Sequence, residues 1–146
     1  MNDAEKFLAA VLPAYVAAET AIHNGDPAPR KALWSREDPV TLFGAAVTGR
    51  GWPELEATFD WLGRSFSDCT SYENELVAAG ASGDLAYHVA IEHSAASVNG
   101  APRVYELRVT TVFRREDGQW RIVHRHGDPH TSDGTLERAL GGELRP

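Results

Sequence analysis

Two histidines and an aspartate near the end of the chain have the types and spacing for acid–base chemistry. His124, His126 and Asp128 form the pattern His-x-His-x-Asp, and alternate residues of a β-strand face the same side. Histidine titrates near neutral pH, so one ring can act as general acid or base while the other positions a substrate and Asp128 orients a ring. Packing and hydrogen bonding within the last strand are the alternative role of these histidines. Metal binding is disfavoured, because side chains about 6–7 Å apart along a strand do not readily ligate one ion.

The hairpin before these residues decides which way they face. Asp117-Gly118 predicts a two-residue turn, since both residues tolerate a positive φ. Such a turn pairs Thr111 with His124, which places both histidines on the inward, apolar face of the strand. A bulge or a three-residue loop reverses every side chain and turns Arg125 inward instead. We predict the first register and keep the second as the alternative.

Helices precede the strands along the chain. Apolar residues at helical spacing predict helices over residues 3–23, 28–34 and 52–66, and residues 40–43 read as a short strand. Asn2 caps the first helix, and Pro13 predicts a kink or a break in it. After residue 69 the period changes to two, which predicts strands at 70–79, 84–94, 103–115 and 119–128. This order indicates an α+β fold with an antiparallel sheet.

Composition restricts the classes of function. The chain has 146 residues and a formal net charge of −7, which suits one domain and argues against general nucleic-acid binding. No apolar run approaches the ~20 residues needed to cross a bilayer, so no membrane contact is expected. The single cysteine, Cys69, gives no sign of secretion, and a cytoplasmic location is expected. Residues 1–130 form the predicted domain, and residues 131–146 a tail that is a short helix or disordered.

The segment LRVTTVFRREDGQWRIVHRHGD, residues 107–128, carries a family resemblance. With the helix order before it, the chain resembles the nuclear-transport-factor-2-like superfamily, and within it the SnoaL-like and ketosteroid-isomerase-like branch. The segment is also similar to the association domain of calcium/calmodulin-dependent kinase. The resemblance implies a cone in which a curved sheet wraps the helices, a cavity at its wide end, and homodimers formed through the convex sheet face. It specifies the fold better than the reaction, because one fold hosts many functions.

The resemblance also implies site residues. Asp38 lies where isomerase-like members keep a carboxylate base, and an apolar wall would raise its pKa toward a useful range; its alternative role is a turn aspartate before Pro39. Tyr15 lies on the inward stripe of the first helix and can serve as a phenol donor. The strand that should supply a second acid carries Arg108 and Thr110 instead, so steroid isomerisation is not expected.

The remaining candidates are pocket-lining residues and ligand-binding arginines. Arg108 and Arg125 can bind an acidic ligand in the alternative register, although a place on the outward or dimer face of the sheet is the preferred interpretation of both. The expected lining also includes Asp128 and the residues Trp34, Trp52, Phe59, Tyr87 and Thr111. Plain core packing is the alternative, and more frequent, role of the four aromatic residues. We predict a small-molecule-binding protein that uses no cofactor and no metal, with Asp38, His124 and His126 as acid–base catalysts of an isomerase, dehydratase or hydrolase reaction. The alternative is a non-catalytic ligand-binding or dimerisation module of the same fold.

Overall fold

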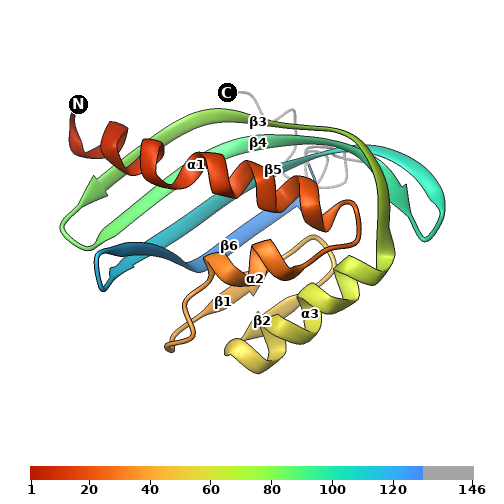
Figure 1. Ribbon diagram of the computed structural model, residues 1–146, viewed down its shortest axis with the longest axis horizontal. Helices are drawn as coiled ribbons and strands as arrows, with labels where there is room; N and C mark the ends of the chain where they lie inside the picture. The colour runs from red at the N-terminus through yellow and green to blue at the C-terminus, as the bar shows by residue number, and fades with distance from the viewer. Residues whose placement is uncertain (130–146) are drawn as a thin grey trace, which may run out of the picture.

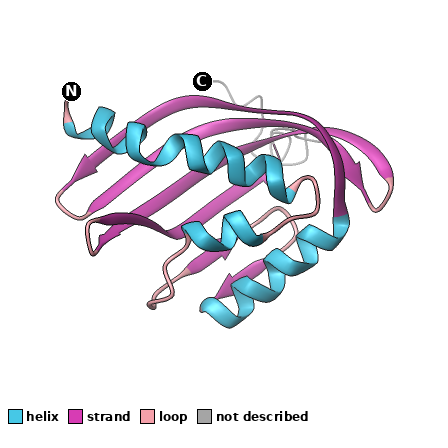
Figure 2. Cartoon of the chain, in the orientation of Figure 1, coloured by secondary structure: helices cyan, strands magenta, loops and turns pink. Residues whose placement is uncertain are grey.

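A six-stranded sheet curves around three helices that all lie on one of its faces (Figures 1 and 2). The computed structural model describes residues 1–129. The helices are α1 (Asp3–Ile22), α2 (Ala28–Leu33) and α3 (Trp52–Ser65), and the strands are β1 (Thr41–Phe43), β2 (Thr48–Arg50), β3 (Phe66–Ser82), β4 (Leu85–Val98), β5 (Ala101–Glu116) and β6 (Gln119–Pro129). Their order in the sheet is β2-β1-β6-β5-β4-β3, antiparallel except for the β1–β6 pair. The predicted α+β fold with a curved sheet is therefore confirmed.

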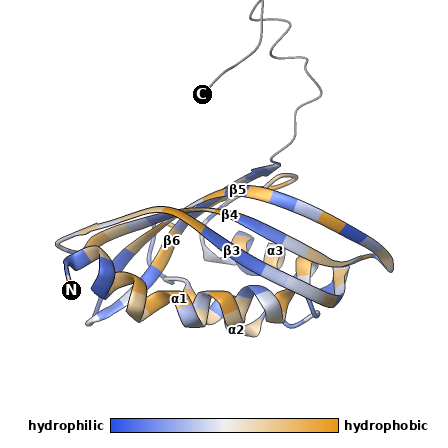
Figure 3. Ribbon diagram, turned by 90° about the horizontal axis from the view of Figure 1, so that it is seen from above, coloured by the Kyte–Doolittle hydropathy of each residue, from blue (hydrophilic) through white to orange (hydrophobic). Residues whose placement is uncertain are grey.

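Helix α1 lies across the hollow of the sheet (Figure 3). The Asn2 side chain caps it by accepting a hydrogen bond from the Glu5 N–H at 2.8 Å, as the sequence predicts. The helix continues through Pro13 without the predicted break. Its apolar stripe is buried against the sheet and consists of Phe7, Val11, Tyr15, Ala18 and Ile22.

Helix α3 covers the end of the sheet that carries β1 and β2. Leu55 and Phe59, from its predicted stripe, are fully buried and join the core with Trp34, Val40 and Leu42. Strand β2 was not predicted, because its three residues include Gly49, a type depleted in strands, and no large apolar side chain. The predicted tail, residues 131–146, lies outside the described residues. No helix within residues 1–129 combines the length and the apolar composition needed to cross a bilayer.

Bulges give the sheet its curvature. Register shifts interrupt the β3–β4 ladder twice and the β5–β6 ladder once. An extra residue in one strand bends that strand and increases its twist. The long strands β3, β4 and β5 consequently arch over α1 rather than lying flat (Figure 3).

The bulge between β5 and β6 overturns the predicted register of the last strand. The turn forms as predicted, with positive φ at Asp117 and Gly118 and with Phe113 opposite Ile122. Beyond that pair the register shifts by one residue, so that Thr111 pairs with Arg125 and not with His124. His124 and His126 therefore face outward, and Arg125 faces inward. The prediction of inward histidines is wrong, and the alternative register holds.

Strand β4 also presents an unexpected face to the helices. Its buried positions alternate through Ala86, His88, Ala90, Glu92 and Ser94. The apolar set Leu85, Tyr87, Val89 and Ile91 lies on the opposite, outer face of the sheet. Tyr87 is 45% exposed, so its predicted place in the lining of an internal pocket is wrong. Small and polar side chains therefore face the hollow from the middle of the sheet.

Candidate functional site

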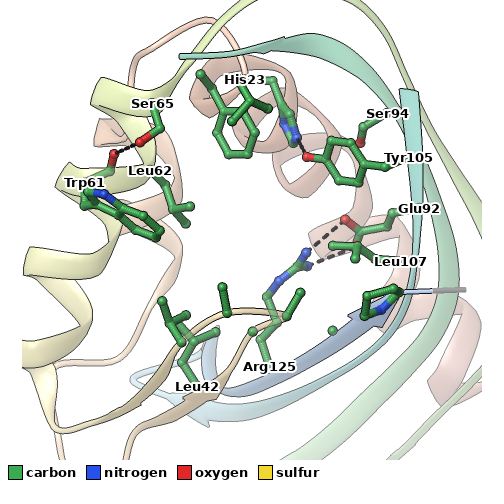
Figure 4. A pocket seen from close by; sticks show the side chains of 18 of the residues that line it. His23, Leu42, Trp61, Leu62, Ser65, Glu92, Ser94, Tyr105, Leu107 and Arg125 are labelled. Carbon is green, nitrogen blue, oxygen red and sulfur yellow. Dashed lines mark hydrogen bonds and ion pairs between the residues drawn. The ribbon is translucent and has the colours of Figure 1, made fainter. Parts of the chain in front are cut away.

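A cavity of about 360 Å³ lies between the C-terminal end of α3, the turn between β1 and β2, and the inner face of β4, β5 and β6. Figure 4 shows the α3 side chains on one side of the cavity and those of β4 and β5 on the other. The Asn99 N–H of the β4–β5 hairpin donates to the Ser65 carbonyl oxygen at 2.7 Å, which fastens the hairpin to the end of α3. The apolar part of the wall includes Leu42, Val47, Trp61, Leu62, Phe66 and Leu107.

The floor of the cavity holds a buried ion pair between strands β4 and β6. Arg125 donates to the two carboxylate oxygens of Glu92 at 2.9 and 3.1 Å, and these residues are only 6% and 2% exposed. The Tyr15 hydroxyl donates to Glu92 Oε2 at 2.6 Å and accepts from Arg125. Burial alone would lower the pKa of Arg125, but the charge of Glu92 outweighs it and the pKa is raised. Burial raises the pKa of Tyr15 well above its usual value, so the phenol stays neutral.

A second buried ion pair joins α1 to α2. Arg30 donates to both carboxylate oxygens of Glu19 at 2.6 and 2.7 Å. Burial would raise the pKa of Glu19, but the guanidinium groups of Arg30 and Arg125 lower it to about 2. Two carboxylates thus face two guanidinium groups, and their charges cancel. The cavity offers an anionic ligand no unbalanced positive charge from Arg125 or Arg30.

His23 and Tyr105 form a third polar contact at the cavity wall (Figure 4). His23 Nδ1 lies 2.6 Å from the carbonyl oxygen of Glu19, and Nε2 hydrogen-bonds the Tyr105 hydroxyl. Burial lowers the pKa of His23, which keeps the imidazole neutral near pH 7. Burial raises the pKa of Tyr105 to about 12. A neutral imidazole bonded to a phenol is a pair of groups that can hold or transfer a proton.

The sequence pattern points to Arg125 and Tyr15 but not to the other polar residues in and beside the cavity. His23, Arg30, Glu92 and Tyr105 line it, and Glu19 lies behind Arg30; they come from α1 and its C-cap, α2, β4 and β5. One signal was present, because Tyr15, Glu19 and His23 follow one another at four-residue spacing along the apolar stripe of α1. A carboxylate on an otherwise apolar helix face is rarely buried without a partner, so it indicates a buried ion pair.

The predicted catalytic residues lie away from this cavity. Asp38 is exposed in the turn before β1 and does not line the cavity. His124 Nδ1 hydrogen-bonds Thr41 Oγ1 at 2.7 Å on the outer face, and burial lowers the pKa of His124. Both His124 and His126 contact the Phe43 ring edge to face at 5.5 Å. The structure therefore brings the two histidines together on the outer face, away from the cavity.

The predicted lining residues divide between the core and the outer face. Trp34 packs on Phe59 with ring centroids 5.4 Å apart, and Trp52 also contacts Phe59; these three rings fill the core and do not line the cavity. Thr111 is fully buried 3.3 Å from the Tyr15 hydroxyl, beside the Glu92–Arg125 pair. Arg108 pairs with Asp128 at 3.1 Å on the outer face.

Metal ligation has no arranged site among residues 1–129, where no three His, Cys, Asp or Glu side chains gather around a common point. Glu92, which lines the cavity, and Glu19 beside it each accept from an arginine. Arginine cannot be deprotonated in proteins, so a metal would have to displace a permanent cation. The side chains of the cavity therefore suit an organic ligand better than an ion.

Comparisons with known proteins agree with this architecture. The family model of the SnoaL-like domain matches residues 11–129, whereas no curated protein matches the sequence significantly. A ketosteroid isomerase-like protein from Erwinia carotovora atroseptica superposes with a TM-score of 0.70 at 20% identity, covering 90% of this chain and 100% of that one. A nuclear transport factor 2-like superfamily protein from Salmonella enterica serovar Typhimurium superposes with a TM-score of 0.68 at 22% sequence identity, covering 86% of this chain and 90% of that one.

A third solved structure, an uncharacterized protein with a cystatin-like fold from Caulobacter vibrioides, gives a TM-score of 0.68 at 18% identity and covers 95% of this chain and 98% of that one. At these identities the solved structures establish the fold alone. The family model, in contrast, spans most of the chain and reaches from α1 to the end of β6. The chain therefore belongs to the SnoaL-like domain family.

Proposed function

We propose that the protein binds a small, uncharged and largely apolar molecule in the cavity beside α3. The observation that carries this proposal is a hollow of about 360 Å³ with a mainly apolar wall above buried ion pairs whose charges cancel. Ligand sites in proteins are typically concave, mostly apolar and equipped with a few placed polar groups. The volume is near the lower end of their usual range of roughly 300–1,000 Å³, which suits a ligand of one or two rings.

The charge balance argues for a neutral ligand. An anion would have to compete with Glu92 for Arg125, which already donates to both oxygens of that carboxylate. Removing one partner from a buried pair leaves the other charge unpaired, at a cost of several kcal/mol. A neutral molecule enters without disturbing either pair. The expected binding of an acidic ligand by Arg108 and Arg125 gains no support, since Arg108 lies on the other side of the sheet.

Acid–base catalysis at Asp38, His124 and His126 stays a prediction from the sequence. The cavity gives it no support, because none of the three side chains lines it. If the family's isomerase-type or dehydratase-type chemistry occurs in this protein, the proton transfers fall to His23 and Tyr105. The cytoplasmic location also stays a prediction, based on the single cysteine.

A bicyclic alcohol, 2-tetralol, is the probe for this function. We expect saturable 1:1 binding by isothermal titration calorimetry to the wild-type protein. Leu107→Trp should abolish binding, because an indole at this lining position fills the hollow. Leu85→Trp is the matched control, since Leu85 lies on the outer face and is 57% exposed. Equal loss of binding in both variants, or no binding by the wild-type protein, would contradict the proposal.

We also propose that the outer face of the sheet is the interface of a homodimer. Exposed apolar side chains gather there on neighbouring strands, with Leu85 and Tyr87 on β4 and Val77 on the bulge of β3. Exposed apolar clusters of this kind often mark protein interfaces. Light scattering is expected to give twice the mass of one 15.9 kDa chain, and the double variant Leu85→Glu/Tyr87→Glu should give one chain mass. A monomeric wild-type protein at micromolar concentration would exclude this interface.

A further inference from the structure

The hydrogen bonds of His23 fix the position of its proton. Nδ1 lies 2.6 Å from the Glu19 carbonyl oxygen, and a carbonyl oxygen can only accept a hydrogen bond. Nδ1 therefore carries the hydrogen. In a neutral imidazole the other nitrogen is then an acceptor, and the neutral form is favoured by burial beside Arg30 and Arg125. Nε2 of His23 accordingly has a lone pair, and not a hydrogen, for its partner.

The partner of Nε2 is the Tyr105 hydroxyl, so the direction of that bond follows. Tyr105 donates its only hydrogen to His23. Ser94, adjacent on β4, hydrogen-bonds the same phenol oxygen and lowers the pKa of Tyr105, which is the effect of a donor. The hydrogen of the Tyr105 hydroxyl is therefore already used in the bond to His23. Toward a molecule in the cavity, which Tyr105 lines, the phenol oxygen can only accept a hydrogen bond.

We infer that Tyr105 acts toward the cavity as a hydrogen-bond acceptor, and that the site selects a ligand hydroxyl over a ligand carbonyl at this wall. A hydroxyl can donate to the Tyr105 oxygen. A carbonyl oxygen at the same place would face another oxygen lone pair with no hydrogen between them. The inference deepens the proposed function, on which it rests, and names the ligand class as neutral apolar alcohols. His23 is the residue that sets this preference, although its own hydrogen is directed away from the ligand.

Two probes with one carbon skeleton, 2-tetralol and 2-tetralone, test this inference by calorimetry. The wild-type protein is expected to bind the alcohol about threefold to tenfold more tightly, which is the effect of one net hydrogen bond. In Tyr105→Phe the alcohol should lose this advantage while the affinity for the ketone stays unchanged. In His23→Phe the Tyr105 hydrogen is released, so the ketone should gain affinity and the preference should disappear or reverse. Tyr87→Phe, on the outer face of the sheet, is the matched control and should behave as the wild-type protein does.

The outcomes separate this inference from the proposed function. Equal affinity for the two probes in the wild-type protein, or an unchanged preference in His23→Phe, overturns the inference and leaves the cavity as a binding site. If neither 2-tetralol nor 2-tetralone binds to the wild-type protein, both the inference and the proposed function are overturned. Nitrogen-15 NMR of the histidine rings provides a test that needs no variant to fold. We expect the Nδ1–H tautomer for His23, and observation of the Nε2–H tautomer or of a charged ring at pH 7 would overturn the inference.

Discussion

Replacing Arg125 with methionine is expected to lower the free energy of unfolding by about 3–5 kcal/mol, measured by urea denaturation. The substitution keeps an unbranched side chain but removes the cation that faces Glu92 and Tyr15. Glu92 is then left as an uncompensated charge that is 2% exposed, and breaking one partner of a buried pair costs far more than the pair itself contributes.

Arg108→Met is the matched control on the neighbouring strand. Arg108 pairs with Asp128, but their side chains are 59% and 44% exposed, and exposed pairs contribute no more than about 1 kcal/mol. Adding Glu92→Leu to Arg125→Met removes the unpaired carboxylate and should recover part of the lost stability. Equal effects of Arg125→Met and Arg108→Met would show that the network is not buried as described.

The stability of the protein is expected to fall as the pH drops from 6.5 toward 4, and His88 is the main cause. His88 is fully buried between the rings of Phe7, Tyr15 and Phe113, and neither ring nitrogen has a hydrogen-bond partner among residues 1–129. Burial lowers its pKa from 6.5 to about 4. Between pH 6.5 and 4 the imidazole is therefore protonated in the unfolded chain but not in the folded chain. The free energy of unfolding falls by about 3 kcal/mol across this range.

His88→Leu should flatten this limb of the stability profile, recorded as urea midpoints between pH 4 and 8. It should not remove the limb entirely, because burial also lowers the pKa of His23. Glu19 causes a separate loss of stability at lower pH, because its carboxylate is protonated in the unfolded chain near pH 4.5 but in the folded chain only near pH 2. At pH 8 the variant is expected to be at least as stable as the wild-type protein, since it removes two unpaired buried nitrogens. A profile unchanged from wild type, with His126→Leu as the exposed control, would contradict the assignment.

Local signals were sufficient to predict every element of the fold except the short strand β2. The Asn2 cap, the apolar stripe of α1 and the Asp117-Gly118 turn each depend on residues within a few positions of one another. Interactions of this range are encoded in the sequence pattern itself. The helices, the long strands and the hairpin between β5 and β6 could be predicted for this reason.

The face of β6 could not be predicted, because its sequence permits both registers. Ile122, His124 and His126 alternate as plausibly as Val123, Arg125 and Gly127 do, and no Gly or Pro marks the bulge beside Val112 and Phe113. The decision comes from distant partners. Arg125 finds Glu92 and Tyr15, residues 33 and 110 positions away, and such tertiary contacts leave no local pattern.

The candidate site was hidden by the same kind of long-range pairing. Strand β4 carries its large apolar residues on the outer face, so alternation alone directs attention to Tyr87 rather than to Glu92. His23 and Tyr105 are separated by 82 positions. The family pattern points to Asp38, yet in this chain Asp38 lies in an exposed turn. The charge of Glu19 on the apolar stripe of α1 was the local sequence feature that pointed to the buried ion pairs.

A crystal structure of the protein with bound 2-tetralol tests directly whether the cavity beside α3 is a ligand-binding site. We expect the bicyclic ring to lie between Leu107 and Trp61, with its hydroxyl within hydrogen-bond distance of the Tyr105 oxygen and with the Glu92–Arg125 pair intact. A cavity closed by the side chains of Leu62 and Phe66, or the probe bound only on the outer face of the sheet, would contradict it.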